Sequence, residues 1–291
     1  MKTYNISRVI FEIETSQGLA DLIHVTRLSR YPPVLFLHGF GSNADVWFAH
    51  QNSLGNFFKN RHFDCWSLHL SNATVGNIQS LADEDLYSAI SFIFDKTQQP
   101  VLLVTHSMGG IIARVLTSPH FEHSFSLAKL EAMVKGIVLL TVPHHGVDAG
   151  DIKKLEETAH QIRDYFKINK RISADFGLGF IQLLSESRLL AELNSPPALN
   201  PNIKWLNAIG KHDHVVPISS ATFSPSEISA SFFEQKSFDC DHMVYPFNSI
   251  LQKITGRLSD IATIFSSSIR IYPAIHRAPE VGEWISEIFK E

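Results

Sequence analysis

The pentapeptide THSMG at residues 105–109 places a serine, Ser107, where a strand gives way to a helix. A short apolar run at 100–104 precedes it and is typical of a strand that is buried on both faces of a parallel sheet. The residues at 109–116 begin with two glycines and predict a helix. A strand that reverses sharply into a helix lifts the side chain at the turn toward the free N–H groups of the helix start. We therefore predict that Ser107 is a nucleophile.

The neighbours of Ser107 match a nucleophile turn in all but one position. The pattern G-x-S-x-G requires small residues two before and two after the serine, because the turn is strained. Gly109 satisfies the pattern, whereas Thr105 stands where glycine is expected. A bare S-x-G is common in proteins, so the interpretation depends on the predicted strand and helix around it.

A second turn supplies groups that can stabilise an oxyanion. The apolar run at 33–37 predicts another buried strand, and it leads into the sequence HGFGS at 38–42. We expect the backbone N–H groups of Phe40 and Met108 to converge on the negative oxygen of a tetrahedral intermediate. Removing one such donor typically costs about 3 to 4 kcal/mol of transition-state stabilisation. The alternative is an ordinary glycine-rich connection between a strand and a helix.

Asp213 is the predicted acid of a catalytic triad. A serine hydroxyl is a poor nucleophile until a histidine removes its proton and a carboxylate orients that histidine. The run at 203–210 predicts a strand, and Asp213 lies in the loop KHDHVVP that follows it. The flanking His212 and His214 leave a metal site as an alternative, but alternate residues of a short loop point apart. No Cys/His set at zinc spacing accompanies them, so we expect no metal.

Two histidines compete for the role of the base. His242 follows a strand-like run at 230–238 and lies 29 residues after the predicted acid, which leaves room for one helix and one strand. His276 lies between a strand-like run at 268–272 and an amphipathic segment at 279–289 that predicts a C-terminal helix. We take His242 as the base and keep His276 as the alternative.

These segments together resemble the α/β-hydrolases of the bacterial lipase and esterase kind, from about Pro32 to the end of the chain. The sequence TVPHHG at 141–146 is similar to the turn after the sixth strand in triacylglycerol lipases and in inositol-deacylase-like lipases. The segment at 184–194 resembles the helix that precedes the acid strand in the same group. The resemblance implies an α/β-hydrolase fold, in which a mostly parallel sheet carries helices on both faces and the site lies at the carboxyl ends of the strands.

The residues and the resemblance predict a serine hydrolase that cleaves carboxylic esters, with Ser107, His242 and Asp213 as its triad and with no cofactor. The expected substrate is a small-molecule or lipid ester with an acyl chain of some length. A thioesterase or an acyltransferase with the same triad is the nearest alternative, since only the pocket and the exclusion of water separate these reactions. A non-catalytic binding protein on the same fold is the alternative from another class.

Length and composition suit a single α/β-hydrolase domain over residues 1–291. Between 147 and 200 the sequence predicts no strand, and helices are expected at 153–166 and 179–193. We interpret this insertion as a helical cap over the site. Caps in lipases shield an apolar acyl pocket, and such a cap would allow transient contact with a lipid surface.

Charge and cysteine content exclude several other classes. The chain carries 25 Lys and Arg against 29 Asp and Glu, with a net charge of −4 and no basic block, so nucleic-acid binding is not expected. Cys65 and Cys240 are its only cysteines and do not indicate a disulfide framework. No apolar run reaches the length of a signal peptide or a membrane span, so a cytoplasmic location is expected, although export without a cleaved signal leaves no trace in a sequence. The oligomeric state is not predicted.

The remaining predicted elements are those that position these loops. Residues 8–27 predict a hairpin, and a helix is expected to begin at residue 42 or 43 and to continue through residue 58. A strand at 63–68 and a helix at about 81–96 follow. Strands that alternate with helices predict a parallel sheet that is covered on both sides.

Overall fold

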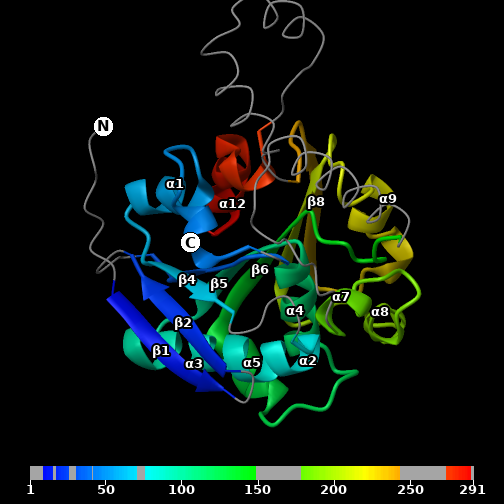
Figure 1. The fold of residues 1–291 in the computed structure, drawn as a ribbon, viewed down its shortest axis with the longest axis horizontal. Coiled ribbons are helices and arrows are strands. Elements are labelled where there is room, and N and C mark those ends of the chain that lie inside the picture. Colours follow the sequence, from blue (N-terminus) through cyan, green and yellow to red (C-terminus); the bar gives the residue numbers. More distant parts are fainter. Residues whose placement is uncertain are drawn as a thin grey trace, which may run out of the picture.

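The computed structural model describes residues 9–15, 18–25, 31–40, 42–70, 76–148, 178–242 and 273–289. At the centre of this part of the chain is an eight-stranded sheet with the strand order β1-β2-β4-β3-β5-β6-β7-β8 (Figure 1). The strands are β1 (Val9–Thr15), β2 (Gly18–His24), β3 (Val34–Leu37), β4 (Cys65–His69), β5 (Val101–His106), β6 (Val134–Leu140), β7 (Lys204–Gly210) and β8 (Phe232–Phe238).

Two kinds of strand pairing build the sheet. β1 and β2 form an antiparallel hairpin in which Thr15 pairs with Gly18, which confirms the hairpin predicted at 8–27, and β2 pairs antiparallel with β4. From β4 to β8 every neighbouring pair of strands is parallel. Because parallel strands end at the same edge of a sheet, the loops after β3, β5, β6, β7 and β8 meet at that edge. These are the loops in which the sequence places the candidate site residues.

Alternating side chains of the buried strands pack into two hydrophobic cores, one on each face of the sheet. On β3, Leu35 and Leu37 belong to the first core, whereas Val34 and Phe36 belong to the second. The first core is covered by α3 (Tyr87–Thr97), α4 (Met108–Thr117) and α5 (Leu127–Met133), and the second by α1 (Leu54–Asn60) and α12 (Pro279–Phe289). Figure 1 shows these two groups of helices on opposite sides of the sheet. The expected mostly parallel sheet with helices on both faces is therefore confirmed.

Shorter helices lie in the connections. A helical stretch formed by α2 (Ile78–Ser80) and a π-helix (Leu81–Leu86) leads into α3, so the helix predicted at about 81–96 begins earlier and in part as a π-helix. The others are η1 (Ala44–Trp47), α7 (Leu178–Ile181), α8 (Arg188–Leu193), α9 (Ile218–Ala221), η3 (Pro225–Glu227) and η4 (Ile275–Arg277). Over the described ranges, no helix combines the length and the apolar character that crossing a membrane requires.

The single helix predicted from residue 42 or 43 through 58 is wrong. The chain forms the short η1 and then, after a turn, the separate helix α1. The side chain of Asn43 accepts a hydrogen bond from the N–H of Asp45 and caps one 3₁₀ turn, and the extended backbone of Ser53 begins α1. Apolar residues in both pieces face the same core, so their spacing alone resembles one continuous helix.

The helix predicted at 179–193 is also interrupted, because α7 and α8 are separated by a turn. The Ser187 hydroxyl accepts a hydrogen bond from the N–H of Leu190 and starts α8 as a new helix. The helix predicted at 153–166 and the strand predicted at 268–272 lie outside the described residues.

Candidate active site

Ser107 lies at the turn between β5 and α4 in a strained backbone conformation. Its φ of 54° and ψ of −126° belong to a region that residues with a side chain rarely adopt. Glycine is required at position 109, because a Cβ atom on Gly109 would stand 2.6 Å from the carbonyl oxygen of His38. Thr105, in place of the expected glycine, is buried, and its hydroxyl donates to the carbonyl oxygen of Val138 at 2.8 Å. The neighbouring strand β6 thus accommodates the larger residue.

The turn after β3 packs directly against the turn that carries Ser107. A Cβ atom on Gly39 would stand 2.8 Å from the Cβ atom of Ser107. Met108 is the first residue of α4, so its N–H has no acceptor within that helix. Phe40 belongs to the turn after β3, and its side chain packs against the first core. Both predicted oxyanion donors, Phe40 and Met108, therefore belong to turns that adjoin Ser107.

His38 holds the turn after β3 in place. Its Nδ1–H donates to the carbonyl oxygen of Gly39 at 2.8 Å, and its Nε2 accepts a hydrogen bond from the N–H of Leu70 at 3.3 Å. Burial lowers the pKa of His38 to about 4. The ring is consequently neutral at pH 7, which is the only state that can both donate and accept. This role of His38 leaves no signal in the sequence, because its acceptor and its donor are main-chain groups.

Asp213 and His242 form a buried carboxylate–imidazole pair beyond the ends of β7 and β8. The Nδ1–H of His242 donates to Oδ2 of Asp213 at 2.9 Å, and the two side chains are only 3% and 1% exposed. The other carboxylate oxygen, Oδ1, accepts the backbone N–H groups of Val215 and Val216 at 2.8 and 2.7 Å. This fixed carboxylate selects the tautomer of neutral His242 in which Nε2 carries no proton and can act as a base.

A second carboxylate–imidazole pair crosses the first. The dipeptide Asp-His occurs at 213–214 and again at 241–242, and the aspartate of each copy pairs with the histidine of the other. Nδ1 of His214 lies 2.8 Å from Oδ2 of Asp241, whose Oδ1 accepts the N–H of His242 at 2.7 Å. Asp241 is in turn fixed through main-chain hydrogen bonds with Pro273 and Ile275. The repeated dipeptide is the feature of the sequence that could have indicated this role of Asp241.

The histidines that admitted a metal site pair with different carboxylates. His214 pairs with Asp241, whereas Nε2 of His212 lies 3.8 Å from Oδ1 of Asp239. In the described ranges of the chain, no group of three or more histidine, cysteine or carboxylate side chains is assembled as a metal ligand set.

The predicted base, His242, lies beside the turn that carries Ser107. The ring of His106, the residue before Ser107, has its centroid 4.5 Å from that of the His242 ring. The Nε2–H of His106 donates to the main-chain carbonyl oxygen of His242 at 3.0 Å. The predicted acid and base are therefore held together, and the base is held next to the predicted nucleophile.

His276, the alternative base, lies close to this cluster, but none of the carboxylates in the described ranges orients it. Its ring centroid lies 5.6 Å from that of His106 and 6.1 Å from that of Trp47. Among the described residues, neither of its ring nitrogens has a hydrogen-bond partner, and only 3% of the residue is exposed. Burial, assisted by the nearby Arg277 and His242, lowers the pKa of His276 to about 3. Both candidate histidines thus lie near His106, and of the two it is His242 whose ring is paired with a carboxylate.

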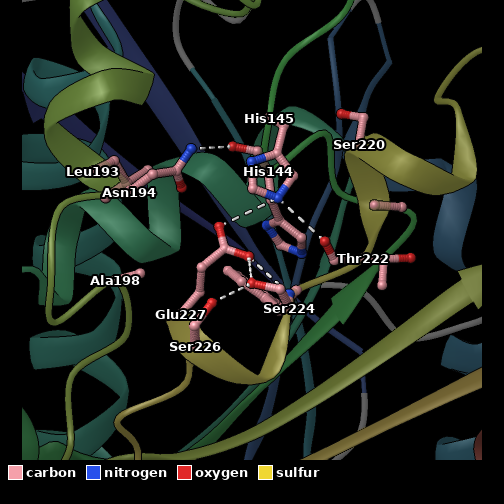
Figure 2. A network of polar contacts seen from close by, with 12 residues as sticks. His144, His145, Leu193, Asn194, Ala198, Ser220, Thr222, Ser224, Ser226 and Glu227 are labelled. Atoms are coloured by element: carbon pink, nitrogen blue, oxygen red, sulfur yellow. Dashed lines mark hydrogen bonds and ion pairs between the residues drawn. The ribbon is translucent and has the colours of Figure 1, made fainter.

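The TVPHHG motif, which follows β6, forms a polar network with residues of β7 and of neighbouring loops. His144 is buried, and its Nε2 lies 3.2 Å from Oδ1 of Asn207. Nδ2 of Asn194 donates to the carbonyl oxygen of His144 at 2.9 Å, and Nε2 of His145 lies 3.4 Å from Oε1 of Glu227 (Figure 2). These contacts connect β6, β7, α8 and η3, so the motif fixes the surrounding loops in the described structure.

The buried Arg114 of α4 extends this network. One of its terminal nitrogens, Nη2, donates to the carbonyl oxygens of Leu193 and Ala198, both at 3.1 Å, and to Oδ1 of Asn194 at 2.9 Å. Burial lowers the pKa of Arg114 to about 9, and the charge of Glu227 partly opposes this effect. The end of α8 and the chain that follows it are thereby attached to α4, the helix that begins at the nucleophile turn.

Comparison with known proteins identifies a family match and a curated relative of this chain. Residues 34–244 match the Alpha/beta hydrolase family. A curated relative, triacylglycerol lipase 1 of Arabidopsis thaliana, is 29% identical over a 136-residue alignment that covers 40% of this chain and 35% of the lipase. The chain thus matches only about a third of the length of that relative.

Solved structures share the fold at low sequence identity. An esterase from Pyrococcus furiosus superposes with a TM-score of 0.54 at 16% identity, over 91% of this chain and 95% of the esterase. The naproxen esterase (carboxylesterase NP) of Bacillus subtilis superposes with a TM-score of 0.53 at 13% identity, over 88% of this chain and 93% of the esterase.

Proposed function

Since this chain belongs to the alpha/beta hydrolase family, we propose that it is a serine hydrolase that cleaves carboxylic esters. One observation carries the proposal: the buried Asp213–His242 pair lies beside the strained turn that presents Ser107. A carboxylate that fixes a histidine tautomer next to a serine at a strand-to-helix turn is the arrangement that activates a hydroxyl for attack. A protein that only binds a ligand has no chemical need for a buried, oriented imidazole beside that turn.

In the acylation step, Nε2 of His242 takes the proton of the Ser107 hydroxyl while Oγ forms a bond to the ester carbonyl carbon. The carbonyl oxygen becomes negative, and the N–H groups of Phe40 and Met108 stabilise it. The Asp213 carboxylate stabilises the imidazolium that forms on His242. The imidazolium then donates its proton to the departing alkoxide, and an acyl-enzyme remains.

Deacylation repeats these steps with water in place of the serine hydroxyl. His242 removes a proton from a water molecule, and the resulting oxygen nucleophile attacks the acyl carbon. The tetrahedral intermediate returns the proton through His242 to Oγ of Ser107, which releases the carboxylic acid. The chain's own side chains supply every proton transfer in this scheme, so it requires no cofactor.

The substrate side of the proposal is an ester with an acyl chain of some length, bound beneath a cap formed by about 147–200 within a single domain. Support comes from the described ends of this segment, where Val147 forms a β-bridge with Leu184. Leu178 and Ile181 of α7 are 48% and 54% exposed, and apolar side chains at the surface suit contact with an acyl chain or a lipid surface.

An acyl-length series tests the cap. We expect ester hydrolysis to become faster from acetyl to longer acyl chains and to rise when detergent micelles are added. Replacement of Leu178 and Ile181 with serine should flatten this dependence, whereas Ile218→Ser, which changes an equally exposed side chain on α9, should leave it unchanged. Equal rates on acetyl and longer esters, unaffected by micelles, would leave the segment without this role.

Covalent labelling tests the reaction itself. A fluorophosphonate probe should form an adduct that peptide mass mapping locates on Ser107, and Ser107→Ala should abolish both the adduct and hydrolysis of p-nitrophenyl esters. A triad nucleophile typically contributes about 10⁶-fold to kcat. Ser226→Ala, at an exposed serine of η3, is the matched control and should label like the wild type. Activity of Ser107→Ala within tenfold of the wild type, or an unlabelled wild type, would refute the proposal.

A further inference from the structure

Given the proposed function, on which this assignment rests, we infer that His106 is a positioning residue that sets the distance between the base and the nucleophile. His106 is the last residue of β5 and immediately precedes Ser107. The Nε2–H of its ring donates to the main-chain carbonyl oxygen of His242 at 3.0 Å. The strand that carries the nucleophile is thereby bonded directly to the residue that carries the base.

Among the described residues, three hydrogen bonds hold His242, and their partners lie in different parts of the fold. Asp213 accepts from its ring Nδ1–H at 2.9 Å, and the carboxylate of Asp241 accepts from its main-chain N–H at 2.7 Å. These two acceptors belong to the loops after β7 and β8, so they orient the imidazole without reference to Ser107. The bond from His106 is the contact among these three that relates the base to the nucleophile turn.

The positioning role requires the ring of His106 to donate a hydrogen bond while the ring stays neutral. Burial, with additional effects of the nearby His242 and His276, lowers the pKa of His106 well below its ordinary value. The ring centroids of His106 and His242 are 4.5 Å apart, so a positive charge on His106 would oppose formation of the His242 imidazolium. The carbonyl acceptor selects the Nε2–H tautomer, which is neutral. Both requirements are met by an imidazole that is buried and bonded as this one is.

Variants at position 106 can separate the hydrogen bond to His242 from the packing of the side chain. Glutamine and methionine have side chains of similar length and volume, but only glutamine carries a neutral N–H that can donate to the carbonyl oxygen of His242. His106→Met therefore removes the donor, and His106→Gln retains it. His276→Leu is the matched control, because His276 is also buried, its ring centroid lies 5.6 Å from that of His106, and its ring makes no hydrogen bond to any residue that the structure describes.

Displacement of a reacting group by about 1 Å can cost about 100-fold in rate. We expect His106→Met to lower kcat for p-nitrophenyl esters about 10- to 100-fold with KM unchanged, and to slow fluorophosphonate labelling of Ser107 by the same factor. His106→Gln should recover most of both rates, and His276→Leu should resemble the wild type. Thermal unfolding of each variant separates a loss of positioning from a loss of fold.

Three outcomes would overturn the assignment. His106→Met could label and turn over like the wild type, His106→Gln could be as slow as His106→Met, or His276→Leu could show the same loss of kcat, which would indicate packing in place of the hydrogen bond. A wild-type protein that does not label at Ser107 would refute the proposed function, and the assignment with it. Full labelling of His106→Met beside an unlabelled Ser107→Ala would refute the assignment alone.

Discussion

One added methyl group at Gly39 is expected to slow ester hydrolysis about 10- to 100-fold. A Cβ atom there would stand 2.8 Å from the Cβ atom of Ser107 and 3.1 Å from the main-chain oxygen of His106, whereas ordinary contact begins at 3.4 Å. The turn after β3 and the nucleophile turn must therefore separate by roughly 0.6 Å, since neither contact involves the flexible end of a side chain. Because about 1 Å of misplacement can cost about 100-fold, Gly39→Ala should lower kcat by a large part of that factor.

The same methyl group at Gly136 provides the matched control. Gly136 lies near the start of β6, at the opposite edge of the sheet from Ser107, and a Cβ atom there would stand 2.5 Å from the ring of Phe289. Overpacking of this kind typically destabilises a protein by about 1 to 3 kcal/mol. We expect both variants to lose stability by amounts in this range, but only Gly39→Ala to lose kcat.

Two measurements on each variant separate a loss of kcat from a loss of stability. Urea unfolding gives the loss of stability, and initial rates at saturating p-nitrophenyl ester, at a temperature where both variants are folded, give kcat. A Gly39→Ala variant with wild-type kcat, or a Gly136→Ala variant with an equal loss of kcat, would refute the placement of the turn after β3 against the nucleophile.

Further expected outcomes concern the triad and a pH-dependent contact. His242→Ala should lose several orders of magnitude in kcat while His276→Leu stays near the wild type, and the reverse result would make His276 the base. Asp213→Asn should fold normally and lose about 10⁴-fold in kcat, because an amide selects the wrong tautomer of the base, and wild-type kcat would contradict its role as the acid. Burial alone would lower the pKa of His123, but hydrogen bonds, first among them that to Asp83, raise it. A raised pKa stabilises the fold fully below the unfolded pKa of about 6.5 and less as pH rises through the folded value, so urea unfolding should show His123→Gln to be more destabilising at about pH 5.5 than at about pH 8.5. An equal effect at both pH values would contradict this linkage.

Apolar runs predicted the buried strands well, because a strand covered on both faces carries mostly apolar side chains. The runs at 33–37, 100–104 and 203–210 correspond to β3, β5 and β7, and the amphipathic segment at 279–289 is α12 in full. Helix continuity was harder to predict. η1 and α1 present their apolar residues to one core, so the break between them is visible only as the caps at Asn43 and Ser53.

Candidate chemistry was predictable where a residue type and its place after a strand both mattered. Ser107, Asp213 and His242 each follow a strand whose end lies at the same edge of the sheet, and chain order alone brings such residues together. The parts played by His106 and Asp241 were not predictable in this way. Each acts through a main-chain group of His242, and neither a residue's type nor its place after a strand specifies such a main-chain partner.

The two crossed Asp–His pairs have a consequence for proton NMR. In each pair an imidazole Nδ1 proton lies against a carboxylate oxygen, at nitrogen–oxygen distances of 2.9 Å for His242 and 2.8 Å for His214, and protons shared in this way resonate far downfield of the amide region. The side chain of His242 is 3% exposed and that of His214 is 62% exposed, so exchange with solvent should erase the His214 resonance first on warming. The repeated Asp-His dipeptide thus provides two NMR signals from the same pair of loops. The His214 signal reports exchange with solvent, and the His242 signal persists as long as its hydrogen bond to Asp213 stays buried.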